Sequence, residues 1–178
     1  YNEGLKLLLD AFNLSQTDPL ISFLLGKAMM IKEQYQKAYN YYRNCISYMT
    51  DNSSFWCDLG VLYYKNKQYP DSLVAYQRAL YISSDVEDAW LNMGAVFEKM
   101  KQFQNAKKVY LSGKSHIKDE KKIEEIQRRI RLLEKFDNSH YKIDNDIICM
   151  PDDNNFVQIP LEFTNNYLAA VPRILPNF

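Results

Sequence analysis

Residues 56–63 read WCDLGVLY, and this stretch recurs along the chain at a fixed interval. Its most distinctive members are a tryptophan, a Leu-Gly pair three residues later, and a tyrosine three residues after the glycine. The same positions 34 residues later hold Trp90, Met93, Gly94 and Phe97, and 34 residues earlier they hold Ser22, Leu25, Gly26 and Met29. A constant period of this length predicts an array of similar structural units.

The segment that follows each of these stretches keeps the same period. Aromatic residues recur at Tyr1, Tyr35, Tyr69 and Phe103, and large residues at Leu8, Tyr42, Tyr76 and Tyr110. Two series of small residues accompany them, at Gly4, Ala38, Ser72 and Ala106 and at Ala11, Cys45, Ala79 and Gly113. Small residues in register are expected where two helix backbones cross closely, with large residues filling the space beside them. Paired helices of this pattern are typical of the tetratricopeptide repeat (TPR).

The register predicts an all-α fold, a right-handed TPR superhelix over residues 1–136. We expect a leading half repeat at 1–14, then three full repeats of two helices each, at 19–32 and 35–48, 53–66 and 69–82, and 87–100 and 103–116. Pro19 after Asp18 suits a first helical turn, and Ser84 with Glu87 predicts a capping box. Because the leading helix is a lone second helix, at least one further repeat is expected upstream.

Residues 119–136 read DEKKIEEIQRRIRLLEKF and place Ile123, Ile126, Ile130 and Leu133 on one helical face. We expect this helix to cap the open end of the last repeat. A coiled coil is the alternative, although two heptads are short for one. The basic residues Arg128, Arg129 and Arg131 are interpreted as the solvated face of the helix.

Residues 137–178 form a segment rich in proline and asparagine without a helical period. Such a composition favours disorder. Its apolar residues, which include Ile147, Phe156 and Leu161, favour instead an extended segment docked on the repeats or on a neighbouring chain over 147–163.

The composition excludes several classes of function. The chain has 178 residues, with 22 basic and 22 acidic side chains, so it lacks the positive excess of a direct nucleic-acid binder. It has no apolar run of the roughly 20 residues that cross a membrane. Its three cysteines form no CxxC pair, which favours reduced thiols in an intracellular protein.

The sequence also lacks a recognisable catalytic centre. The two histidines, His116 and His140, have no metal-ligand spacing and are interpreted as exposed loop residues. No glycine-rich phosphate-binding motif is present. We therefore expect a non-enzyme with no catalytic residue, metal, cofactor or small-molecule substrate.

The surface expected to bind a partner is the concave groove lined by the first helix of each repeat. In TPR units the second, fifth, sixth, ninth and twelfth positions face it. The predicted site residues are Leu20, Phe23, Leu24, Lys27, Met30, Cys57, Asp58, Val61, Tyr64, Leu91 and Asn92. Their apolar members predict a strip that suits an amphipathic helix or an extended peptide, with Phe23, Val61, Tyr64 and Leu91 as main contacts.

Residues 55–79, FWCDLGVLYYKNKQYPDSLVAYQRA, resemble the TPR region of the general glucose-repression transcriptional corepressor and of UTX-type histone demethylases. The matching blocks include Phe55-Trp56-Cys57, Gly60-Val61-Leu62-Tyr63-Tyr64 and Gln68-Tyr69, and a weaker likeness extends over 18–136. Ser22 departs from the pattern, and no demethylase domain is present. The resemblance implies a nuclear adaptor subunit of a corepressor or chromatin complex, with a WD40-type corepressor as a partner; the cytoplasm is the alternative location.

Two other functions remain open from the sequence. The chain is alternatively a TPR scaffold subunit of a ciliary, ubiquitin-ligase or respiratory assembly. It is otherwise the regulatory TPR fragment of a larger chromatin enzyme.

Overall fold

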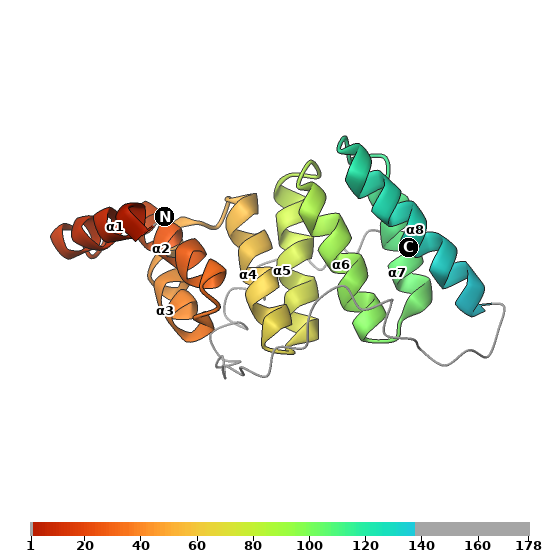
Figure 1. Ribbon diagram of the computed structural model, residues 1–178, viewed down its shortest axis with the longest axis horizontal. Coiled ribbons are helices and arrows are strands. Elements are labelled where there is room, and N and C mark those ends of the chain that lie inside the picture. Colours follow the sequence, from red (N-terminus) through yellow and green to blue (C-terminus); the bar gives the residue numbers. More distant parts are fainter. Residues whose placement is uncertain (1, 138–178) are drawn as a thin grey trace.

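The computed structural model describes residues 2–137, and every regular element in this range is a helix. The α-helices are α1 (Asn2–Leu14), α2 (Pro19–Ile31), α3 (Tyr35–Cys45), α4 (Ser53–Lys65), α5 (Tyr69–Ile82), α6 (Glu87–Lys99), α7 (Phe103–Gly113) and α8 (Glu120–Asp137), and a 3₁₀ turn, η1 (Ile46–Tyr48), follows α3. The helices stack in a row as the pairs α2/α3, α4/α5 and α6/α7, with α1 and α8 at the two ends (Figure 1). The predicted all-α TPR superhelix is confirmed.

The helix boundaries follow the 34-residue register closely. All six helices of the three full repeats begin at their predicted residues, and α8 covers the predicted capping segment. Two second helices are shorter than predicted, because α3 ends at Cys45 and α7 ends at Gly113. The predicted docked segment at 147–163 lies outside the described residues.

The close crossing of the two helices in each repeat is carried by a glycine and a tyrosine. In the middle repeat, a Cβ added to Gly60 would lie 2.6 Å from the ring of Tyr76. The hydroxyl of Ser72 donates a hydrogen bond of 2.7 Å to the carbonyl of Gly60. Gly26 with Tyr42, and Gly94 with Tyr110, repeat the same packing. The predicted role of the small residues at this crossing is therefore confirmed.

The turn between the two helices of each repeat contains a non-glycine residue in the left-handed region. Glu33, Lys67 and Lys101 have φ of 56°, 59° and 59°. In the second repeat, the amide of Lys67 donates to Tyr64 and the amide of Gln68 donates to Tyr63, which closes the first helix with a Schellman motif. These three residues also recur every 34 residues, so the turn is part of the repeat.

The predicted helix starts are capped in two different ways. Asp18 caps α2 as expected, because its Oδ1 accepts from the amides of Leu20 and Ile21. The predicted capping box at Ser84 is wrong, because α6 begins after Val86, whose side chain makes no cap bond. The carbonyl of Ser84 instead accepts the indole N–H of Trp90 at 2.9 Å, which holds this loop in a different path.

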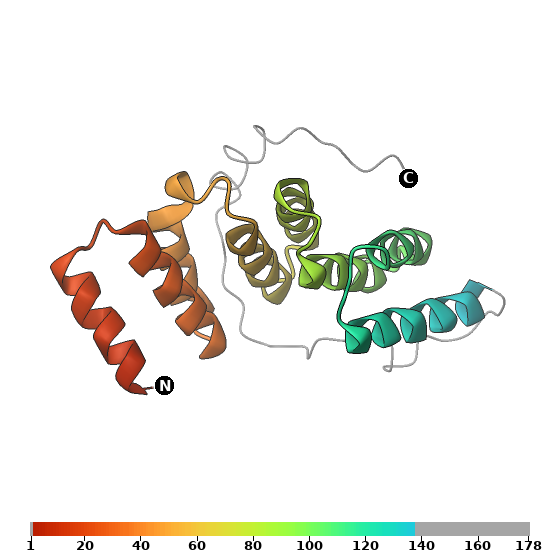
Figure 2. The ribbon, with the colours of Figure 1, turned by 90° about the horizontal axis from the view of Figure 1, so that it is seen from above.

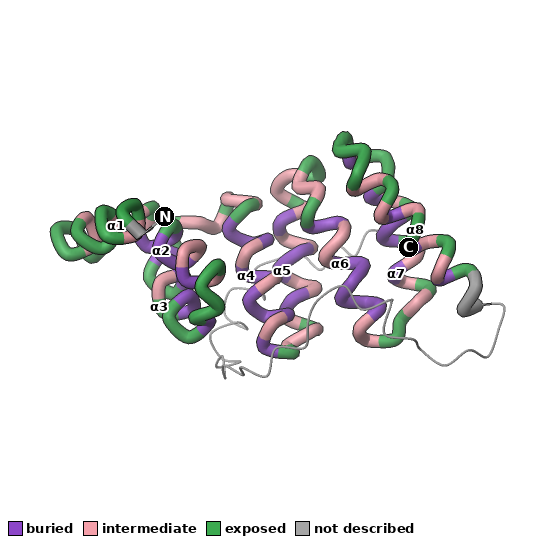
Figure 3. The backbone as a smooth tube through the Cα atoms, viewed as in Figure 1, coloured by how far each residue is buried: buried purple, intermediate pink, exposed green. Residues whose placement is uncertain are grey.

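Helix α8 covers the end of the last repeat, as predicted. Ile126 and Leu133 on α8 are buried, and α8 packs against α7 (Figure 2). Helix α1 at the other end differs, because none of its described residues is buried (Figure 3). Among the helices of 2–137, none is both long and apolar enough to cross a membrane.

Candidate functional site

The predicted site residues all lie on the first helices of the repeats, α2, α4 and α6. These three helices are neighbours, since α2 contacts α4 and α4 contacts α6. We call the surface that they present the first-helix face. It is defined by the eleven predicted residues together with Ser54 and Asp88, which share their register.

The apolar members of this face differ in accessibility. Phe23 is buried between the rings of Tyr42 and Phe55, with ring centroids 6.2 and 5.9 Å away, and Tyr64 and Cys57 are also buried. Met30, Val61 and Leu91 are half-buried against the core. Leu20 and Leu24 on α2 are the exposed large apolar residues of the predicted set. The apolar surface is therefore concentrated at the first repeat.

An ion pair crosses the face between α2 and α4. The Nζ of Lys27 lies 3.3 Å from an Oδ of Asp58 and 3.4 Å from the hydroxyl of Ser54. The same ammonium lies 5.2 Å from the ring centroid of Phe23. Burial raises the pKa of the Asp58 carboxyl, and the neighbouring Lys27 partly offsets this effect. The predicted residues Lys27 and Asp58 are thus brought together by the fold.

A second group of charges lies where α6 meets α8. The Nζ of Lys122 is 2.8 Å from Asp88 and 3.2 Å from Glu87. The hydrogen bond to Asp88, and further contacts with Glu87, raise the pKa of Lys122. Sequence reasoning missed Lys122 because α8 lies outside the three repeats, so the 34-residue register gave no signal for it. The face therefore changes from apolar at α2 to charged at α6.

Cys57 and Asn92 lie between these two charged groups and have structural partners. Burial, with Asp58 and Asp88 adding to it, raises the pKa of the Cys57 thiol to about 12. A thiol with such a pKa carries almost no thiolate near neutral pH and is a poor nucleophile. Asn92 forms a side-chain hydrogen bond with the hydroxyl of Tyr76.

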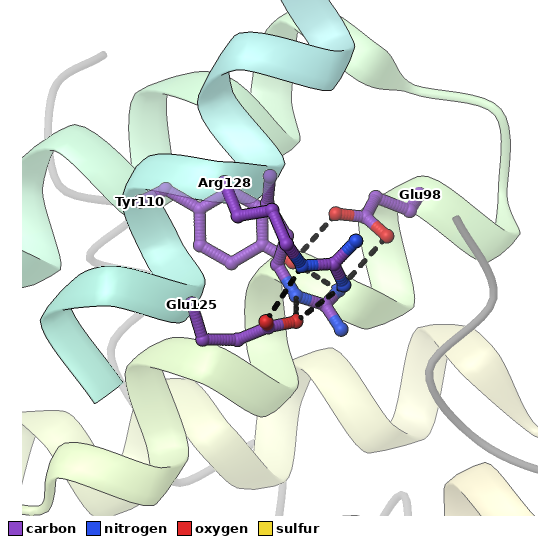
Figure 4. Close-up of polar contacts among 5 residues, drawn as sticks. Glu98, Tyr110, Glu125 and Arg128 are labelled. Atoms are coloured by element: carbon purple, nitrogen blue, oxygen red, sulfur yellow. Dashed lines mark hydrogen bonds and ion pairs between the residues drawn. The ribbon is translucent and has the colours of Figure 1, made fainter. Parts of the chain in front are cut away.

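The twelfth position of the third repeat, Glu98, is buried by α8 in a polar network (Figure 4). Its carboxylate accepts a hydrogen bond of 2.7 Å from Tyr110 and lies 3.0 Å from Nη1 of Arg129. Arg129 also pairs with Glu125 at 2.8 Å. The expectation that Arg129 lies on the solvated face of α8 is wrong, because Arg129 points into this network. Arg128 and Arg131 are exposed, as expected.

Burial acts on both charges of this network. It raises the pKa of the Glu98 carboxyl, against the lowering effect of Arg129. For Arg129, burial works against the charged form, but Tyr110 and Glu98 keep the pKa of the guanidinium above its ordinary value. The arrangement is that of a structural ion pair that fixes α8 on α6 and α7.

A small apolar cavity of about 270 Å³ lies outside the first-helix face. Its lining residues are Gln77, Leu80, Tyr81, Ser84, Trp90, Met93 and His116. His116 was expected to be an exposed loop residue, but it is half-buried and stacks on Trp90 with ring centroids 5.3 Å apart. Across residues 2–137, no three His, Cys, Asp or Glu side chains are grouped so that they could hold a metal ion.

The comparisons with known proteins agree with this architecture. Residues 62–101 match the TPR repeat. No curated protein matches the chain in sequence. Three solved structures illustrate the likeness in fold. The structure of MamA has a TM-score of 0.68 at 14% identity, covering 93% of this chain and 85% of that chain.

Two further structures are TPR domains by their titles. The Sgt2 TPR domain from Aspergillus fumigatus has a TM-score of 0.61 at 17% identity and covers 75% of this chain and 90% of its own. The Arabidopsis OM64 TPR domain has a TM-score of 0.58 at 18% identity and covers 64% of this chain and 94% of its own. With the 34-residue register and the paired helices, these matches identify the chain as one that carries a TPR repeat domain, folded as a TPR superhelix.

Proposed function

We propose that this chain is a non-catalytic scaffold that binds a segment of another protein across the first-helix face. The observation that carries this proposal is the composition of that face. Exposed Leu20 and Leu24 lie at one end, and the ion-paired Lys27, Asp58 and Asp88 lie toward the other. A face of this kind fits an amphipathic helix or an extended peptide with an apolar end and a polar end.

The depth of each side chain decides which residues a partner reaches. Val61 and Leu91 are half-buried, so their outer atoms remain available, whereas Phe23 and Tyr64 are buried and mainly support the face from below. Contacts with the half-buried residues exclude water at roughly 25 cal/mol per Å² of apolar area. A few central contacts are expected to dominate the binding free energy.

The test is affinity purification with variants of the face. Val61→Asp places a charge at its centre, and Ser54→Arg adds bulk and charge at an exposed position on α4 without touching the core. Both variants should lose most of the captured partner, while Leu111→Glu, at an exposed leucine on α7, should retain it. Thermal melts establish that each variant is folded. Equal capture by wild type and both face variants would place the binding site elsewhere.

At a finer level, we propose that the assembly is a nuclear corepressor or chromatin complex. The support is the resemblance of residues 55–79 to the TPR region of the glucose-repression corepressor and UTX-type demethylases. Affinity purification from nuclear and cytoplasmic fractions, followed by mass spectrometry, tests this proposal. Enrichment of a WD40-type corepressor would support it. Enrichment of ciliary, ubiquitin-ligase or respiratory subunits would replace it with the corresponding assembly.

A further inference from the structure

The end of the molecule at α1 and α2 exposes more apolar surface than any other part of residues 2–137. Nine large hydrophobic residues are exposed in the described range, and five of them lie between residues 7 and 24. They are Leu7, Leu9, Leu14, Leu20 and Leu24. Contiguous exposed apolar surface of this kind usually marks a binding site.

The 34-residue register shows what this surface corresponds to. Leu7 is 65% exposed, whereas Ala75 and Val109, its equivalents in the second and third repeats, are 0% exposed. Gly4 has open space around its Cα, whereas the equivalent Ser72 bonds to Gly60 on the first helix of its own repeat. The exposed side of α1 is therefore the side on which each later second helix receives its first helix.

A second contact in the same series confirms this correspondence. Ala11 is equivalent to Gly113, where an added Cβ would lie 2.8 Å from Cβ of Trp90 on the first helix of the third repeat. Ala11 itself is half-buried. The small residues Gly4 and Ala11 thus prepare α1 for close contact with a helix that residues 2–137 do not supply.

Helix α2 provides the other wall of the same seat. Leu20 and Leu24 are 57% and 39% exposed. Their equivalents on α4, Ser54 and Asp58, face the preceding first helix, because both contact Lys27 of α2. Leu20 and Leu24 therefore face the position of a first helix before α2. We call the surface formed by Gly4, Leu7, Ala11, Leu20 and Leu24 the N-terminal trough.

The chain itself contains three examples of such a seat with its occupant. Helix α2 packs against α3 and α4, α4 packs against α5 and α6, and α6 packs against α7 and, through its ion pairs, against α8. Each occupant carries a glycine beneath the tyrosine of the adjacent second helix, as Gly60 does beneath Tyr76. The chemistry of an occupant can be read from these three cases.

We propose that the N-terminal trough binds one amphipathic helix of a partner protein, antiparallel to α1 and parallel to α2. This helix carries glycine or alanine opposite Leu8 and a large apolar residue over Ala11. Alanine is acceptable there because Leu8 is smaller than the tyrosine that stands at this position in the three full repeats. The proposal rests on the scaffold function proposed above but concerns a separate surface.

A second copy of this chain fits the trough less well. If α1 of one copy lay antiparallel on α1 of another, the helical periodicity would bring the two Asp10 side chains to the same edge of the pair, where like charges repel. Head-to-tail stacking is also disfavoured, because α8 presents Lys121, Glu124 and Arg128 outward at the other end. A partner helix with a small central residue meets neither obstacle.

The test uses a fluorescently labelled peptide of residues 52–66 with Cys57→Ser, because this sequence is the occupant of the equivalent seat in the second repeat. Fluorescence anisotropy should show saturable binding to the protein. Leu7→Glu and Leu20→Glu should each weaken binding by at least about tenfold, because each places a charge in the apolar trough. Leu111→Glu, the same change at a similarly exposed leucine on α7, should leave it unchanged. A peptide that also carries Gly60→Leu should bind at least about tenfold more weakly, because its leucine would meet Leu8.

Three outcomes would overturn the proposal. The peptide shows no binding, it binds Leu7→Glu as well as wild type, or wild type forms a dimer in sedimentation equilibrium that Leu7→Glu dissociates. The third outcome would assign the trough to a second copy. Capture of the natural partner separates this proposal from the proposed function. A partner lost with Ser54→Arg but retained by Leu7→Glu, with no peptide binding, would leave the scaffold intact and remove the trough as a site.

Discussion

Single residues at the helix crossings determine how tightly each repeat closes. Gly60 and Tyr76 are in contact because glycine lets the ring rest on the backbone of α4, and the same pair recurs in the first and third repeats. Gly4 is the exception among the glycines on helices, since it has no neighbour within 4 Å. The same substitution should therefore have opposite effects at Gly60 and at Gly4.

We expect Gly60→Ala to destabilise the protein by about 1–3 kcal/mol, because the new methyl group displaces the buried Tyr76 ring. Gly4→Ala should stabilise the protein by up to about 1 kcal/mol, because alanine favours the helix and meets open space. Urea denaturation of both variants measures these changes. Similar changes of the same sign at the two positions would contradict this account of the crossing.

The two described cysteines should resist modification in the folded protein. Burial raises the pKa of both the Cys45 and the Cys57 thiol to about 12. At pH 8 their thiolate fraction falls by about a thousandfold relative to an ordinary cysteine. In a Cys149→Ser background, labelling by a disulfide reagent should be slow until denaturant unfolds the chain. Rapid labelling of Cys57 without unfolding would show that the first-helix face opens in solution.

At the scale of elements, α8 is attached by charge as well as by apolar contact. Arg129 and Glu98 pair at 3.0 Å with both side chains almost fully buried. Neither charge has solvent to replace its partner. The attachment of α8 to α6 should therefore depend on both members of the pair.

We expect Arg129→Met to cost about 3–5 kcal/mol of stability, because it leaves Glu98 buried without its counter-ion. The double variant Glu98→Gln with Arg129→Met should recover part of this loss. The pKa of Glu98 is already raised by burial, and loss of Arg129 raises it further. The folded state of Arg129→Met then binds a proton more tightly than the unfolded state, so its stability should increase as pH falls toward the ordinary carboxyl range. A pH-independent loss would show that Glu98 is not the cause.

The sequence predicted the elements well where the repeat governs them. The starts of the six repeat helices follow from a period that is expressed in Gly60, Tyr76 and their equivalents. It failed where contacts come from outside the repeat. Ser84 resembles a helix cap, yet its carbonyl serves Trp90, and Arg129 resembles a surface residue, yet it meets Glu98, 31 positions away in the sequence. Such pairings depend on how α8 packs, which no local pattern specifies.

The candidate site was predictable in position but less so in accessibility. The register placed all eleven residues on α2, α4 and α6, because residues 34 apart occupy equivalent positions. It did not show that Phe23 is covered by Tyr42 and Phe55, since that depends on the side-chain packing between repeats. Lys122, which approaches Asp88 from α8, was missed for the same reason.

At the scale of the whole molecule, the two ends of the helix row differ. The α8 end is closed and polar, whereas the α1 end exposes Leu7 and Leu14 beside Leu20 and Leu24. The first-helix face runs between these ends and changes from apolar to charged along the way. A molecule built in this way can hold one partner along its face and a second helix at its open end.

Photo-crosslinking tests the central claim, binding of a partner across the first-helix face, most directly. Benzoylphenylalanine is placed at Ser54, which is exposed on the face, or at Leu111, which is exposed on α7 away from it. Irradiation in cell extract should join a protein partner to the chain through position 54 and not through position 111. Crosslinks through position 111 alone, or equal crosslinks through both positions, would contradict the account.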